Sequence, residues 1–208
     1  PSITDAEINE VVASLKSGWI TTGPKVQQFE QQLRDYTKAP HALCLNSATA
    51  GLHVALLALD LKPGDEVITS AMTFVATYNT IEQAGGRVVL VDIDPNTYNM
   101  DVNLLEQAIT PRTRAIVPVH FAGSPVDLDV VYALAKKHNL RVIEDAAQAI
   151  GTQYKGKRLG SFGDTAVFSF HPNKNITSGE GGCVTTFDEV LAQHVKVLRF
   201  HGIDRDAF

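Results

Sequence analysis

Basic residues are scarce in this sequence, and no part of it concentrates them. The 208 residues include 18 Lys and Arg against 23 Asp and Glu, which gives a formal net charge of −5, and the two signs are interspersed. Proteins that bind nucleic acid or anionic membrane surfaces present a basic patch or stripe. The composition therefore disfavours both kinds of partner.

Long apolar runs are also absent. The longest ones, such as VVLV and HVALLAL, fall well short of the roughly 18 to 20 residues that a membrane-spanning helix needs. The opening PSITDAEINEVV has neither the basic segment nor the hydrophobic segment of a secretory signal. We therefore expect no membrane span and a cytoplasmic location.

Cysteine is rare, and the sequence lacks any set of metal-ligand spacing. Cys44 and Cys183 are the only two cysteines, and both lie in apolar stretches, which is typical of buried thiols in a reducing compartment. A disulfide between them is the less favoured alternative. His41 precedes Cys44 by three residues, but no second pair follows. We predict no structural metal.

What the sequence does contain is the balance of an ordinary soluble domain. With 44% hydrophobic and 20% charged residues, residues 1–208 can bury a substantial core as one large domain. An amphipathic segment from Asp5 to Ser17 predicts a first helix. We expect the next segment, SGWITTGPK, to be a loop, because Gly18, Gly23 and Pro24 break helices.

From His41 onward, short β-branched runs alternate with helical patterns. The expected strands lie in HALCLN, EVITS, RVVLVD, TRAIVPVH, RVIED, TAVFSF and GCVTTF. This alternation predicts an α/β fold with a mostly parallel sheet of about seven strands. Too few residues separate the last two runs for a helical crossover, so one strand should be antiparallel.

In open α/β sheets, ligands bind outside the carboxyl ends of the strands. After the first expected strand comes NSATAG, where a helix N-terminus can hold a phosphate and Ser47 and Thr49 can add hydroxyl donors. The alternative is that Ser47 only caps the helix. The segment matches no nucleoside-triphosphate loop.

The run RVIED ends in two adjacent carboxylates, Glu144 and Asp145. Neighbouring side chains of a strand point to opposite faces, so only one of them can face a given site. That carboxylate either caps the next helix or accepts a hydrogen bond from a ligand cation, such as a protonated pyridine nitrogen.

Two further positions follow apolar strands. Lys174 lies between AVFSF and the small-residue run SGEGG, where a desolvated amine can form a Schiff base; the alternative is a solvated surface lysine. Phe74 lies at a strand-to-helix junction, where it can stack on a planar cofactor or pack in the core. Together the four places supply an anion-binding helix N-terminus, a carboxylate, an amine and an aromatic ring that could bind one cofactor.

Six segments, SGWITTGP, NSATAGLHVAL, PGDEVITSAMTF, VPVHFAG, VIEDAAQ and FSFHPNKNITSGEGG, closely resemble the DegT/DnrJ/EryC1/StrS sugar aminotransferases. The resemblance covers essentially the whole chain. It implies the large domain of fold type I aminotransferases, which bind pyridoxal 5′-phosphate (PLP). That domain has a mostly parallel seven-stranded sheet with one antiparallel strand and helices on both faces. A C-terminal small domain and a homodimer are also implied.

The resemblance assigns roles to individual residues of this sequence. Lys174 corresponds to the catalytic lysine that attaches PLP, and Asp145 to the partner of the pyridine nitrogen. The remaining cofactor contacts that it implies are Ala48, Thr49 and Ser169 at the phosphate, Phe74 on the ring and Gln148 near the ring or its hydroxyl. Thr21 and Thr22 are implied to face the sugar.

The implied reaction is PLP-dependent transamination. Glutamate would donate the amino group, leaving 2-oxoglutarate, and the acceptor would be a 4-keto or 3-keto group of a nucleotide-linked sugar, for lipopolysaccharide or other glycan precursors. Relatives that dehydrate sugars have typically replaced the lysine with His, so Lys174 disfavours that reaction. A non-catalytic binding module or an inactive fragment stays an alternative, because the family's small domain is missing. We expect weak or no transaminase activity from residues 1–208 alone.

Overall fold

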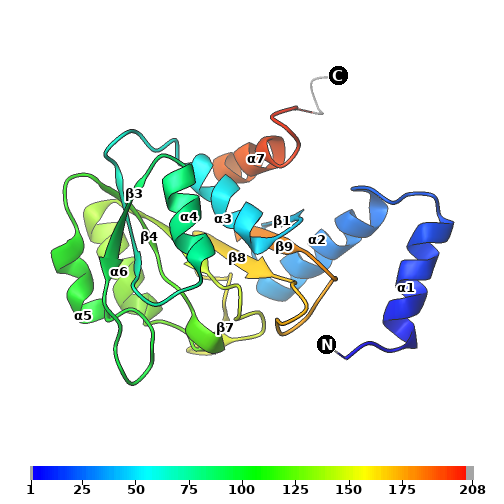
Figure 1. Ribbon diagram of the computed structural model, residues 1–208, viewed down its shortest axis with the longest axis horizontal. Coiled ribbons are helices and arrows are strands. Elements are labelled where there is room, and N and C mark those ends of the chain that lie inside the picture. The colour runs from blue at the N-terminus through cyan, green and yellow to red at the C-terminus, as the bar shows by residue number, and fades with distance from the viewer. Residues whose placement is uncertain (1, 205–208) are drawn as a thin grey trace.

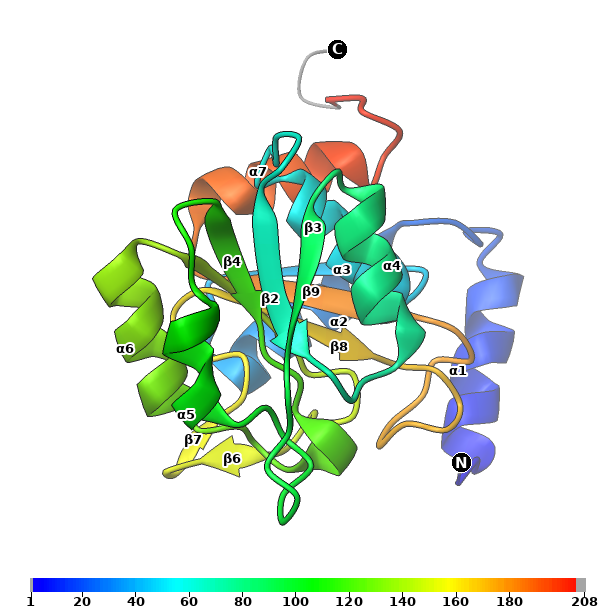
Figure 2. The same ribbon diagram turned by 60° about the vertical axis from the view of Figure 1, so that its left-hand side comes forward.

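The computed structural model describes residues 2–204 as an α/β fold with a central sheet covered by helices (Figure 1). Helix α1 spans Asp5–Lys16, and Thr4 and Glu7 form a capping box at its start. The amphipathic opening is thus helical, as predicted, but α1 has no buried residue. Figures 1 and 2 both place α1 beside the body of the fold rather than on the sheet.

The segment expected to be a loop ends earlier than predicted. Residues 17–23 form turns, but Pro24 and Lys25 already belong to helix α2, Pro24–Thr37. Pro24 occupies the first turn of α2, where its missing N–H costs no hydrogen bond and its fixed φ suits a helix. Reading Pro24 as a helix breaker was therefore wrong.

The seven expected strands are present and form one sheet. They are β1 (His41–Leu45), β2 (Glu66–Ser70), β3 (Arg87–Val91), β4 (Thr113–Val117), β5 (Arg141–Asp145), β8 (Thr165–Ser169) and β9 (Gly182–Thr186). Their spatial order is β1-β9-β8-β5-β4-β2-β3. Within this seven-stranded sheet, β9 runs antiparallel to both of its neighbours, β1 and β8, and the other pairs are parallel, so the prediction of one antiparallel strand is confirmed. A small hairpin of β6 (Gln153–Tyr154) and β7 (Lys157–Arg158) was not expected.

Helices cover both faces of this sheet (Figure 2). Helices α3 (Ala48–Leu57), α4 (Val75–Gln83) and α7 (Glu189–Leu198) pack on one face, and α2, α5 (Val102–Leu105) and α6 (Leu128–His138) pack on the other. Alternate residues of the strands point into the hydrophobic cores on the two faces. Val67 lies in the core beneath α3, α4 and α7, and Ile68 lies in the core beneath α2, α5 and α6. None of the helices within residues 2–204 combines the length and apolar character needed to cross a lipid bilayer.

A close backbone contact fixes the start of α3. A Cβ atom added to Gly182, the first residue of β9, would lie 2.4 Å from the carbonyl carbon of Ser47. Only glycine allows β9 to pass so near the residue that precedes α3. The first residue of the antiparallel strand β9 therefore lies directly against the backbone at the N-terminus of α3.

Candidate active site

A cavity of about 330 Å³ lies among the loops that follow β1, β2, β4, β5 and β8. A cavity of this size suits a small ligand or cofactor. All seven residues predicted to bind the cofactor contribute to its wall: Ala48, Thr49, Phe74, Asp145, Gln148, Ser169 and Lys174. The structure thus brings the predicted set together, while the role of each residue in binding stays a prediction. Thr21 and Thr22 are exposed and do not line the cavity.

At one end of the cavity, α3 points its N-terminus at the lining residues. The hydroxyl of Ser47 accepts a hydrogen bond from the Ala50 N–H at 3.1 Å, so Ser47 does cap the helix. The N–H groups of Ala48 and Thr49 belong to the first turn, which has no preceding carbonyls to bond. Capping and anion binding are therefore compatible here, and Ser169 lies in the same wall.

Asp145 is the buried carboxylate of this cavity, with 6% of its surface exposed. Its Oδ2 accepts a hydrogen bond from the Thr77 hydroxyl at 2.7 Å, and its Oδ1 accepts one from the Ala147 N–H at 3.2 Å. Burial raises the pKa of Asp145, although the hydrogen bonds from Thr77 and Ala147 act against that rise. A cation placed beside Asp145 would therefore favour its ionised form.

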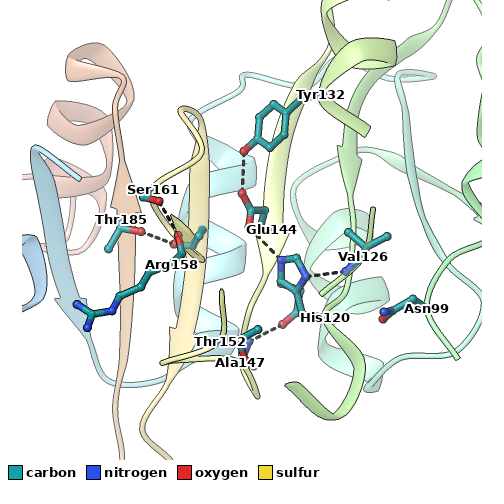
Figure 3. Close-up of polar contacts among 12 residues, drawn as sticks. Asn99, His120, Val126, Tyr132, Glu144, Ala147, Thr152, Arg158, Ser161 and Thr185 are labelled. Carbon is teal, nitrogen blue, oxygen red and sulfur yellow. Dashed lines mark hydrogen bonds and ion pairs between the residues drawn. The ribbon is translucent and has the colours of Figure 1, made fainter. Parts of the chain in front are cut away.

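Glu144 points away from this cavity into the opposite side of the sheet, as the alternation along a strand requires. Its two oxygens accept hydrogen bonds from the Tyr132 hydroxyl at 2.7 Å and from Nε2 of His120 at 2.9 Å (Figure 3). The two neighbouring carboxylates thus lie on opposite sides of the sheet. Asp145 faces the cavity, and Glu144 is enclosed by hydrogen-bond donors of the protein.

Lys174 lies in the turn region after β8, where its backbone N–H donates to the His171 carbonyl at 2.9 Å. Its side chain lines the cavity but is half-buried. The sequence suggested a desolvated amine, and Lys174 as a residue is neither fully buried nor exposed. The reason is that the segment after Phe170 runs along the surface instead of entering the core.

Phe74 and Gln148 complete the wall. Phe74 precedes α4 and has 72% of its surface exposed, so it is not a core residue and its ring is free to contact a ligand. The Ala122 N–H donates to Oε1 of Gln148 at 2.8 Å. Because a backbone N–H can bond only the amide oxygen, the NH2 group of Gln148 is left as a donor for a ligand.

Several residues of this region were not predicted, and Thr77 and His120 are the two that bear most on Asp145. Thr77 lies one helical turn after Thr73 and contacts Asp145 across 68 positions of sequence, so no local pattern indicates the pairing. His120 follows β4 in TRAIVPVH, and the rule that polar residues after apolar strands mark a site should have selected it.

Solved structures with the same architecture include aminotransferases. A Streptococcus pneumoniae protein assigned as a sugar aminotransferase, solved in its PMP form, aligns with 100% of this chain and 57% of its own, at 42% identity and a TM-score of 0.94. The Helicobacter pylori aminotransferase PseC, involved in pseudoaminic acid biosynthesis, aligns with 100% of this chain and 57% of its own, at 37% identity and a TM-score of 0.95. The fold is therefore that of fold type I PLP-dependent aminotransferases.

The family assignment is more specific. Residues 1–208 match the DegT/DnrJ/EryC1/StrS aminotransferase family throughout, and the chain belongs to that family. It is 53% identical to an uncharacterized protein of Methanocaldococcus jannaschii and 50% identical to the spore coat polysaccharide biosynthesis protein SpsC of Bacillus subtilis. Both alignments cover 100% of this chain and 54% of the relative. The chain thus spans about half the length of the curated relatives it matches.

Proposed function

We propose that residues 1–208 form the PLP-binding large domain of a nucleotide-sugar aminotransferase. The observation that carries this proposal is the shared cavity of Asp145, Lys174 and the N-terminus of α3. PLP has a pyridine nitrogen, an aldehyde and a phosphate. A carboxylate, an amine and a helix N-terminus are protein groups that bind these three parts. They come from three separate strand ends and meet at one place.

The residues present fit this cofactor. The first N–H groups of α3 and the hydroxyl of Ser169 would hold the phosphate. The carboxylate of Asp145 would accept a hydrogen bond from the protonated ring nitrogen, and that positive charge offsets the cost of its burial. The exposed ring of Phe74 would cover a face of the pyridine, and the NH2 group of Gln148 would donate to its hydroxyl.

The chemistry divides between cofactor and protein. Bound PLP supplies an electron-accepting ring that carries an amino group from donor to acceptor. Asp145 keeps the ring nitrogen protonated by remaining anionic. Lys174 would hold the cofactor through its Nζ, and the same amine would be placed to move a proton. Its half-buried position leaves the amine accessible to a substrate.

We further propose that glutamate is the amino donor, with 2-oxoglutarate as the product, and that the acceptor is a 4-keto or 3-keto nucleotide-linked sugar. The segments SGWITTGPK and SATAG resemble UDP-4-amino-4-deoxy-L-arabinose:oxoglutarate aminotransferase and support this proposal. The segment LRFHGIDRDAF is also similar, and its last four residues lie outside the described part of the chain. A cytoplasmic role in lipopolysaccharide or other glycan precursor synthesis follows from that resemblance.

A homodimer is part of the proposal. Along α1, Ile8, Val11, Val12 and Leu15 form an apolar row whose members are 38% to 63% exposed. A row of this kind on a helix that buries nothing in its own chain supports an interface with another subunit. Sedimentation of the purified chain would measure the oligomeric state directly.

The visible spectrum with PLP tests the function. The purified chain and two variants, Lys174→Ala and Lys155→Ala, are mixed with PLP under identical conditions. Lys155 is the matched control, because its exposed amine pairs with Asp129 away from the cavity. We expect the absorption band of lysine-bound PLP in the parent and in Lys155→Ala, and its loss in Lys174→Ala.

The alternatives give different results. An equal band in all three proteins would mean that PLP reacts with surface lysines, which contradicts the proposed site. A parent that holds PLP through Lys174 but releases no 2-oxoglutarate from glutamate would favour the non-catalytic binding module.

A further inference from the structure

The side chains of His120, Glu144 and Tyr132 form a chain of hydrogen bonds on the Glu144 side of β5 (Figure 3), and residue His120 also contributes to the cavity wall. The side chain of His120 has no exposed surface, and that of Glu144 is 1% exposed. Nδ1 of His120 accepts a hydrogen bond from the Val126 N–H at 3.2 Å. Nδ1 therefore carries no proton, and Nε2 must be the donor to Glu144.

This chain lies where the ladder between β4 and β5 is interrupted. Pro118 follows β4 and has no N–H, so it cannot donate to β5. Beyond it, two backbone hydrogen bonds remain around Asp145: its N–H donates to the Pro118 carbonyl at 2.8 Å, and its carbonyl accepts from the His120 N–H at 3.1 Å.

The hydrogen bond from His120 to Glu144 joins the segment after β4 to the end of β5. These are the two segments between which Pro118, having no N–H, removes one backbone hydrogen bond. Tyr132, from α6, holds the other oxygen of Glu144 and so ties that helix to the junction. The peptide between Glu144 and Asp145 is thereby held from its side-chain face as well as through its backbone. A rotation of this peptide would turn the Asp145 carboxylate away from the cavity.

We propose that His120 is a positioning residue for Asp145. Held in its Nε2–H tautomer by Val126, it clamps Glu144 and thereby keeps the Asp145 carboxylate aimed at the ring nitrogen of the cofactor. The part concerning the ring nitrogen rests on the proposed function. Residue His120 contributes to the cavity wall, but its side chain is completely enclosed, so the proposed role of the imidazole is exerted through Glu144 rather than on a ligand.

The tautomer can be measured in the cofactor-free chain. Long-range proton–nitrogen NMR spectra of the imidazoles distinguish a protonated Nε2 from a protonated Nδ1, and the His120 signals are those missing in a His120→Gln variant. We expect Nε2–H with Nδ1 unprotonated. Protonated Nδ1, alone or together with Nε2, would overturn the proposed clamp.

Cofactor binding tests the positioning. Two variants separate the bonds of His120: Asn can still accept from the Val126 N–H but cannot reach Glu144, whereas the longer amide of Gln can donate to Glu144. Binding of PLP is compared with binding of an analogue in which carbon replaces the ring nitrogen. We expect His120→Asn to weaken PLP binding about tenfold, to leave analogue binding nearly unchanged, and His120→Gln to recover most of the loss.

Each other outcome decides a separate point. If His120→Asn weakens both cofactors equally, His120 supports the fold in general and the positioning proposal is wrong, while the proposed function stands. If the parent binds PLP no better than the analogue, Asp145 makes no ring-nitrogen bond and the proposal fails with it. If the parent binds neither cofactor, the proposed function itself is contradicted.

Discussion

Glu144 and Asp145 are adjacent in β5, yet their carboxylates occupy opposite environments. Glu144 is enclosed and receives hydrogen bonds from Tyr132 and His120. Asp145 also receives two hydrogen bonds, but its burial still raises its pKa, and it faces a cavity. We expect from this difference that Glu144 mainly stabilises the fold and that Asp145 is the carboxylate able to bind a ligand cation, although one strand carries both.

The largest effect on stability is expected from the enclosed side. Glu144→Ala leaves the Nε2–H of His120 and the hydroxyl of Tyr132 without their acceptor inside the protein, so the free energy of unfolding should fall by about 2–4 kcal/mol. Urea unfolding of the cofactor-free chain measures it. Glu10→Ala, which removes an exposed partner of Lys25, is the control and should cost under about 1 kcal/mol. Equal losses of stability in Glu144→Ala and Glu10→Ala would contradict the structural role of Glu144.

On the cavity side, removing the charge of the carboxylate should change stability in the opposite direction. Asp145→Asn removes a charge that burial disfavours, so the cofactor-free chain should become slightly more stable. Binding of PLP should weaken about 10- to 100-fold, because a charge-assisted hydrogen bond is lost. Unfolding and PLP titration of the same preparations check both. A destabilised variant with unchanged PLP affinity would reverse the assignment of the two carboxylates.

The pH dependence of the free energy of unfolding should also reflect the raised pKa of Asp145. Because the pKa of Asp145 is raised in the folded chain, folded protein binds this proton more tightly than unfolded protein does. Its contribution is present below the ordinary Asp pKa and is lost as the pH rises through the raised value. Subtracting the unfolding curve of Asp145→Asn from that of the parent should isolate this fall. A difference that grows with pH would have the wrong sign.

The smallest effect concerns a single hydroxyl. Thr77→Val keeps the shape of the side chain but removes a donor to Asp145, so the pKa of Asp145 should rise further. Thr80→Val is the matched control on α4, because the Thr80 hydroxyl donates within its own helix. Each variant should lose about 1 kcal/mol of stability. Only Thr77→Val should move the Asp145 titration, followed by carboxyl-carbon NMR.

Sequence patterns predicted the sheet well, because β-branched runs bounded by turn residues depend on local chemistry. Helix α2 was missed because Pro24 can either end a helix or begin one, and the local sequence does not decide between these. The hairpin of β6 and β7 has two residues in each strand, which is too short for any periodicity.

The candidate site was predicted in its members but not in its contacts. Alternation along RVIED required Glu144 and Asp145 to face opposite sides, but it left open which one faces the ligand. That choice is made by Thr77 and Tyr132, which lie on different helices and reach β5 only through the tertiary fold. The exposure of Phe74 is likewise set by the packing of α4, since its sequence context suits a core position equally well.

The most direct test of the account is to locate the lysine that attaches PLP. The chain is equilibrated with PLP, reduced with borohydride to fix the bond, digested and examined by mass spectrometry. The account predicts that the pyridoxyl group is carried by Lys174, with the other lysines unlabelled. Labelling concentrated on another lysine, or spread over exposed lysines with Lys174 unmodified, would contradict it.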